Sequence, residues 1–146
     1  MAWLSDATFR TFHVTESATT VDDDTVEECL ESAKDALANL CGDSIIQEIE
    51  GLSDDDRKGH KFRRAQRKLA YRELLEFMSS RSRDGGIMES ERDANGDTVN
   101  KYVPYTEIQK RRTDLYAEAI EIVERYFQTP DVAGTGNISI TTGKWF

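Results

Sequence analysis

The stretch that decides the fold is residues 54–80, DDDRKGHKFRRAQRKLAYRELLEFMSS. Its apolar side chains recur at intervals of three and four residues, which is the spacing of one face of an α-helix. Ser53 and the aspartates that follow it provide a helix cap and favour the positive end of the helix dipole. We therefore expect a helix over 54–80 whose buried side consists of Phe62, Ala65, Leu69, Ala70, Leu74, Phe77 and Met78.

Two more helices are predicted, one on each side of this stretch. Asp24 and Glu27 form a capping-box pattern before a helix over 25–41, and Gly42 stands where a helix stop is expected. A second box, Thr106 and Gln109, precedes a helix over 107–127. Residues 43–52 are apolar, but the sequence does not settle their structure. The apolar stripes of the two flanking helices are Val26, Cys29, Leu30, Ala33, Leu37 and Leu40, and Ile108, Leu115, Ala119, Ile122, Val123 and Tyr126.

Residues 86–103 break the helical pattern and predict a β-hairpin. Two short β-prone runs flank Asn95-Gly96, a pair that favours positive φ and a tight reversal. Neither run has a strongly apolar face, and a two-stranded ribbon on its own is marginal in water. We expect the hairpin to project and to contact another chain through Ile87, Met88, Val99 and Tyr102.

Both ends of the chain are predicted to be extended arms, so the organisation expected is an N-terminal arm (1–21), a helical domain (22–130) and a C-terminal arm (131–146). Residues 1–21 suggest an ordered arm or a short strand. The C-terminal arm ends in two aromatic rings, which bury about 150–250 Å² each when they find a pocket. It is the candidate partner-binding arm, through Asn137, Ile138, Ile140, Lys144, Trp145 and Phe146.

The charges are segregated along the chain of 146 residues, whose net charge is −9. Residues 1–56 carry a net charge of −13, residues 57–83 carry +8 and residues 84–146 carry −4. The basic block either pairs with acidic faces, in the same subunit or in a neighbour, or meets nucleic-acid phosphates. Pairing is favoured, because the overall charge is acidic and no stacking platform interrupts the cations. The candidate residues are Arg57, Lys58, Lys61, Arg63, Arg64, Arg67 and Lys68.

No pattern for catalysis, a cofactor or a metal stands out. There is no nucleophile elbow and no glycine-rich phosphate cradle, and His13 and His60 have no sequence partner. Asp93, Asn95 and Asp97 alternate as calcium ligands do, but Pro104 stands where the bidentate glutamate is required. Cys29 and Cys41 lie about 18 Å apart along one helix, so we expect reduced thiols. No apolar run approaches the length of a membrane span, and the N-terminus is unlike a signal peptide.

The order of these parts resembles the head–tail connector proteins of tailed phages, also called adaptors or head-completion proteins. The similarity runs over about residues 20–130. It comprises a first helix (TVEECLESAKDALANLCG), a longer one (AQRKLAYRELLEF), a glycine-led hairpin (GGIMESERDANGDTVNKYV) and a closing helix (EIQKRRTDLYAEAIEIVERYF). The acidic excess and the basic stretch 57–72 depart from the family pattern and leave open which face lines the DNA channel.

The resemblance implies a virion structural protein at the neck, made in the host cytoplasm. Such proteins form a ring, commonly of about twelve copies, between the portal and the next neck or tail component, with a terminal arm on the portal and non-specific contact with packaged DNA. Two alternatives remain open: a small acidic binding or regulatory protein, and a nucleic-acid-associated module that uses residues 57–72. Neither the resemblance nor the residues imply an enzyme, a cofactor or a membrane partner.

Overall fold

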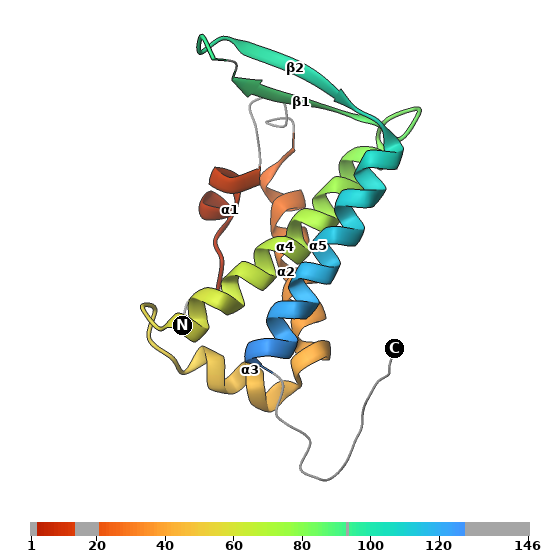
Figure 1. Cartoon of the computed structure of the whole chain (residues 1–146). Coiled ribbons are helices and arrows are strands. Elements are labelled where there is room, and N and C mark those ends of the chain that lie inside the picture. Colours follow the sequence, from red (N-terminus) through yellow and green to blue (C-terminus); the bar gives the residue numbers. More distant parts are fainter. Residues whose placement is uncertain (1–2, 14–20, 93, 128–146) are drawn as a thin grey trace.

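The computed structural model describes residues 3–13, 21–92 and 94–127, and the helices lie side by side with a β-hairpin at one end (Figure 1). Helices α2 (Asp23–Cys41), α4 (Arg57–Ser80) and α5 (Tyr105–Tyr126) are the long ones. Helix α4 packs against both α2 and α5, and each of these runs antiparallel to it. The mainly helical bundle with a hairpin that the sequence predicted is therefore confirmed.

The three helices begin a few residues away from the predicted caps. Asp22 caps α2, because its carboxylate accepts a hydrogen bond from the Thr25 amide at 2.8 Å. Asp56 caps α4 in the same way, accepting from the Lys58 amide at 2.8 Å, in place of the predicted Ser53. The capping box predicted before α5 is not formed: Pro104 precedes the helix in an extended conformation, without a side-chain cap.

The segment that the sequence left open is helix α3 (Asp43–Glu50), which turns the chain between α2 and α4. Gly42 joins the two helices with a φ of 88°, in the left-handed region that a side chain disfavours. Ile45 and Ile49 of α3 close the end of the core opposite the hairpin. The main core lies among α2, α4 and α5 and includes Leu30, Leu37, Phe62, Leu69, Leu74, Ala119 and Val123.

The N-terminal segment differs from the arm or short strand that the sequence suggested, because it contains helix α1 (Asp6–His13). The Ser5 hydroxyl accepts a hydrogen bond from the Thr8 amide, which gives this helix a cap. Phe9 is fully buried in the main core, so tertiary burial holds a segment that has weak helix signals of its own. Residues 1–2 and 14–20 lie outside the described structure.

The hairpin consists of β1 (Ile87–Arg92) and β2 (Thr98–Val103), as predicted, and it is antiparallel, with Ile87 opposite Val103 and Met88 opposite Tyr102. Ile87 and Val103 are buried with Leu75 of α4 and Ile108 of α5 in a second, small core. This core anchors only the base of the ribbon, and the rest extends beyond the helices (Figure 1). In the described part of the chain, no helix is long and apolar enough to cross a membrane.

Candidate assembly surfaces

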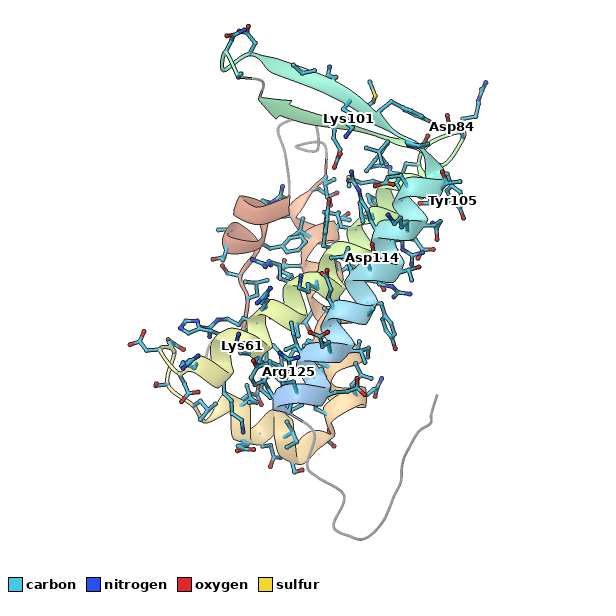
Figure 2. All side chains as sticks on the ribbon, in the orientation of Figure 1. Lys61, Asp84, Lys101, Tyr105, Asp114 and Arg125 are labelled. Carbon is cyan, nitrogen blue, oxygen red and sulfur yellow. The ribbon has the colours of Figure 1, made fainter. Side chains whose placement is uncertain are left out.

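The first surface is basic and lies on the half of α4 that is remote from the hairpin. Arg57, Lys58 and Arg64 are exposed, and the other predicted basic residues are partly exposed. Lys61, Arg64 and Lys68 line a hollow of about 290 Å³ together with the end of α5. Arg63, Arg64 and Arg67 line another, of about 330 Å³, next to Leu4 and Thr8. Figure 2 shows Lys61 and Arg125 at this end of the helices.

Among the described residues, two ion pairs join the predicted basic residues of α4 to other helices, one to α3 and one to α5. Lys58 lies 3.6 Å from Glu48, and Lys68 lies 2.7 Å from Glu118. Lys61 stands over the Tyr126 ring, with its Nζ atom 5.2 Å from the centroid. Burial, together with the positive charge of Arg64, lowers the pKa of Arg67. The carboxylates of α2, expected to pair with these cations in the same subunit or in a neighbour, make no ion pair with them among the residues that the structure describes.

The α2 carboxylates do not reach the cations of α4 because the two helices pack antiparallel. The acidic first half of α2 lies beside the second half of α4, which contributes Glu73 and Glu76 instead of cations. Between them is a shallow groove of about 770 Å³. Its lining includes seven carboxylates, Asp24, Glu27, Glu28, Glu31, Asp35, Glu73 and Glu76, over the apolar side chains of Cys29 and Phe77. Like charges are thus gathered along this groove.

Both cysteines, Cys29 and Cys41, are free in the structure. Cys29 is buried at the edge of the acidic groove, and burial together with Glu73 and Glu28 raises its pKa to about 11. Cys41 is only partly buried, but burial raises its pKa to about 11 as well. Both side chains are therefore protonated and weakly nucleophilic at neutral pH.

The outer face of the hairpin is the third surface, after the basic surface of α4 and the acidic groove between α2 and α4. Met88 and Tyr102 face each other across the strands on this face, with 56% and 49% of their surfaces exposed. Val99 lies on the opposite face, the one that carries Ile87 and Val103, but it is further along the ribbon and 42% exposed. Ile87, predicted to contact another chain, is instead buried against the subunit's own helices. The alternation of a strand explains this difference, because neighbouring residues point to opposite faces.

The base of the hairpin is held in place by polar contacts. The Tyr102 hydroxyl donates a hydrogen bond of 2.5 Å to Asp84, whose other oxygen accepts from the Gly86 amide at 2.9 Å. The bond from Tyr102 is the main cause that lowers the pKa of Asp84 to about 2. On the other face, Arg111 of α5 lies 2.8 Å from Glu89 of β1. These contacts set the direction in which the ribbon leaves the helices.

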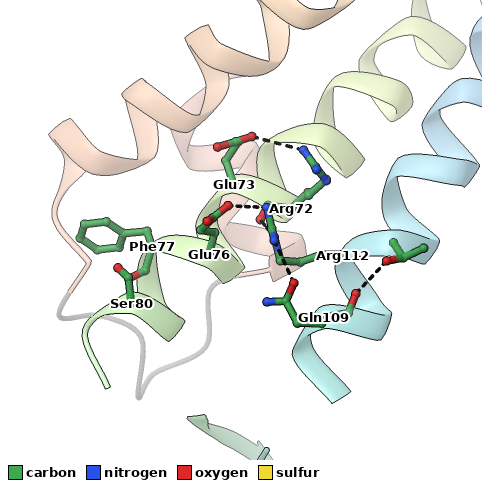
Figure 3. A network of polar contacts seen from close by, with 8 residues as sticks. Arg72, Glu73, Glu76, Phe77, Ser80, Gln109 and Arg112 are labelled. Carbon is green, nitrogen blue, oxygen red and sulfur yellow. Dashed lines mark hydrogen bonds and ion pairs between the residues drawn. The ribbon is translucent and has the colours of Figure 1, made fainter. Parts of the chain in front are cut away.

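A polar network at the same end joins α4 to α5 (Figure 3). The Arg112 guanidinium donates to Glu76, to Gln109 at 3.1 Å and to the backbone oxygen of Arg72 at 3.3 Å. Its side chain is mostly buried, whereas that of Glu76 is mostly exposed. Sequence analysis missed this network and the Arg111–Glu89 pair, because both join residues far apart along the chain.

The predicted partner-binding residues of the C-terminal arm, Asn137 to Phe146, lie outside the described residues, as does Asp93 of the hairpin turn. Among the described residues, no three His, Cys, Asp or Glu side chains are grouped so that they could hold a metal ion. No protein-family model, curated protein or solved structure matches this chain.

Proposed function

We propose that this chain is a structural assembly subunit, a head–tail adaptor that forms a ring between a portal and the next neck or tail component. Its role is to bind other chains rather than to catalyse a reaction. The observation that carries the proposal is the projecting hairpin, which presents Met88, Val99 and Tyr102 to solvent beyond its small anchoring core.

The exposed hairpin is suited to contact with a partner. An isolated two-stranded ribbon has two unpaired edges, and its outer residues gain from burial only when another chain covers them. The Arg111–Glu89 and Tyr102–Asp84 contacts orient the ribbon before binding, so less conformational entropy is lost when a partner arrives. A ribbon that is oriented but uncovered favours an assembly function.

The element order supports the more specific assignment to adaptors. Two antiparallel helices, a hairpin and a closing helix occur in the order that the resemblance to phage connectors implies. The ring, its place in the virion neck and the portal contact through residues 131–146 follow from that resemblance and are part of the proposal.

Binding to portal-bearing particles that lack the neck tests the proposal. We expect the purified chain to co-sediment with such particles, and the double variant Met88→Glu with Val99→Glu to co-sediment at least about tenfold less well. Tyr116→Glu, a change at an exposed aromatic residue on α5, is the matched control and retains binding. Far-ultraviolet circular dichroism verifies that all three chains are folded. A wild-type chain that stays in the supernatant would refute the adaptor proposal.

Association with nucleic acid is the second candidate function, because Arg57 and Arg64 are exposed and pair with no carboxylate among the described residues. Binding by these cations would depend strongly on salt and hardly on sequence. A gel shift of duplex DNA that disappears at high salt, and is lost in Arg57→Glu with Arg64→Glu, would favour this function. The absence of a shift at low salt would exclude it.

A further inference from the structure

Two helix faces of opposite charge carry four residues each with the same spacing. On α2 the residues are Asp24, Glu28, Glu31 and Asp35, and on α4 they are Arg57, Lys61, Arg64 and Lys68. In both sets the intervals are four, three and four residues, so each set forms a straight stripe along one side of its helix. Eleven residues of helix make each stripe roughly 16 Å long. We call them the acidic stripe and the basic stripe.

The two stripes have different surroundings within the subunit. The acidic stripe lies on the exposed side of α2 and lines the shallow groove that α2 forms with Glu73, Glu76 and Phe77 of α4. Three residues of the basic stripe, Lys61, Arg64 and Lys68, line the hollow between α4 and α5 instead. On α4, the groove residues and the basic stripe occupy different faces of the helix. The stripes therefore cannot meet within one subunit.

The acidic stripe has no counter-charges of its own. All four carboxylates are exposed, and none makes an ion pair with another described residue. Asp24 and Glu28, like Glu31 and Asp35, are one turn apart, where like charges repel. In the groove, Glu76 is paired with Arg112 and Glu73 with Arg72, so these two cations are already engaged.

Most of the basic stripe is also unmatched. Lys68 is paired with Glu118, and the other carboxylate in that hollow, Glu121, lies 3.8 Å from Arg125. Arg57 and Arg64 are exposed without an ion pair to a described residue, and Lys61, which stands over the Tyr126 ring, makes no ion pair with a described residue either. Three of the four cations thus remain for an external partner.

We infer that the acidic stripe of one copy binds the basic stripe of a second copy, in a head-to-tail contact that repeats from subunit to subunit. The spacing of four, three and four residues is the same in both directions, so the charges match in a parallel or an antiparallel crossing. Phe77, partly exposed in the groove, adds an apolar contact. When two different surfaces meet in this way from copy to copy, the chain of subunits closes into a ring if the rotations between neighbours add up to a full turn.

This inference rests on the proposed function, in which the chain forms a ring, and it names the surfaces that join the copies. Charge complementarity of this kind sets register and the choice of partner, and salt weakens it. The contact is therefore expected to form at low salt and to weaken at high salt, independently of any portal.

Charge reversal with complementation tests the contact. One variant, Glu28→Lys with Glu31→Lys, reverses the two central charges of the acidic stripe, and the other, Lys61→Glu with Arg64→Glu, reverses the two central charges of the basic stripe. Each alone is expected to weaken self-association in analytical ultracentrifugation at low salt by about tenfold or more, since like charges then face each other. In an equal mixture every reversed position of one variant meets an opposite charge on the other, so association returns to near the wild-type level.

Matched control variants distinguish an effect of the stripes on association from an effect of net charge. Asp114→Lys with Glu124→Lys and Lys101→Glu with Lys110→Glu make the same changes in charge at exposed residues outside both stripes, and association stays at the wild-type level. A wild-type chain that is monomeric at low salt, single reversals without effect, or a mixture that fails to associate would each overturn the inference. If the basic-stripe reversal abolished only DNA binding, the stripe would be a phosphate surface instead. Co-sedimentation with portal particles is measured separately, so an adaptor whose copies meet through other surfaces is distinguished from a chain that is no adaptor.

Discussion

The side chain of Gln66 accepts a hydrogen bond from the backbone amide of Leu4, with 2.9 Å between Oε1 and the nitrogen. Its Nε2 donates to the backbone oxygen of Leu30 at 3.4 Å, and only 2% of the residue is exposed. One buried amide on α4 thus joins the N-terminal segment to α2. An amide suits this position because it supplies a donor and an acceptor without charge.

Gln66→Leu is expected to lower the free energy of unfolding by about 1–3 kcal/mol, because Leu4 and Leu30 each lose a buried partner. Gln66→Glu keeps the acceptor but loses the donor and buries a charge, so it destabilises more at neutral pH. Urea unfolding followed by circular dichroism measures both. Equal stability of the three proteins would contradict this role.

Phe62 is the centre of an aromatic cluster that closes the main core. Its ring centroid lies 5.2 Å from that of Trp3 and 5.1 Å from that of Phe127, both in edge-to-face geometry, and the residue is fully buried. Phe62→Ala is expected to cost about 3–5 kcal/mol in urea unfolding, whereas Phe62→Leu costs less because the cavity is smaller. If both substitutions cost the same, cavity size would not be the cause.

Arg112 and Glu76 form an ion pair in which the two partners are expected to contribute unequally to the free energy of unfolding. Arg112→Met removes all three hydrogen bonds of a mostly buried guanidinium and is expected to cost about 2–3 kcal/mol. Glu76→Gln changes a mostly exposed partner and is expected to cost at most about 1 kcal/mol. Urea unfolding compares the two, and a larger loss for Glu76→Gln would contradict this assignment.

The Tyr102–Asp84 bond makes the base of the hairpin sensitive to acid. The pKa of Asp84 is about 2 in the folded chain, below its ordinary value of 3.8. The stabilisation from its carboxylate is therefore complete above the unfolded pKa and is lost as pH falls from about 4 to about 2. In Tyr102→Phe the main cause of the shift is gone, so the Asp84 pKa is expected to rise toward its ordinary value.

A carboxyl-carbon NMR titration of Asp84 measures this change directly. Tyr105→Phe is the control, because Tyr105 is an exposed tyrosine near the same loop whose hydroxyl does not bond to Asp84. An Asp84 pKa that stays near 2 in Tyr102→Phe would mean that the Gly86 amide and the Ser82 hydroxyl account for the shift instead.

Much of the fold was predictable because its signals are local. The apolar residues at intervals of three and four in α2, α4 and α5, and the turn at Asn95-Gly96 between two short β-prone runs, depend on neighbours within one or two turns of chain. Helix starts were predicted less well. Several aspartates in a row offer similar caps at Asp22 to Asp24 and at Asp54 to Asp56, and only the packed geometry selects Asp22 and Asp56.

The candidate surfaces were predicted only in part. The sequence identified the basic residues of α4 and the exposed Met88, Val99 and Tyr102, because the charged residues and the short β-prone runs around Asn95-Gly96 are visible in the chain. It placed Ile87 among the contact residues, since a strand pattern does not say which face meets the helices. The acidic groove was not foreseen, because it depends on the direction in which α2 crosses α4.

The sequence by itself determined where the three long helices and the hairpin form, where the charges are concentrated along the chain and that each long helix has one apolar side. The tertiary structure alone decided that Phe9 draws residues 6–13 into a helix, that Gln66 links Leu4 to Leu30, and that the acidic and basic stripes lie on separate faces. The physical reason is the distance along the chain between the residues that interact. Secondary structure follows from interactions among near neighbours, whereas the orientation of one helix against another is set by the burial of side chains that are distant in the chain.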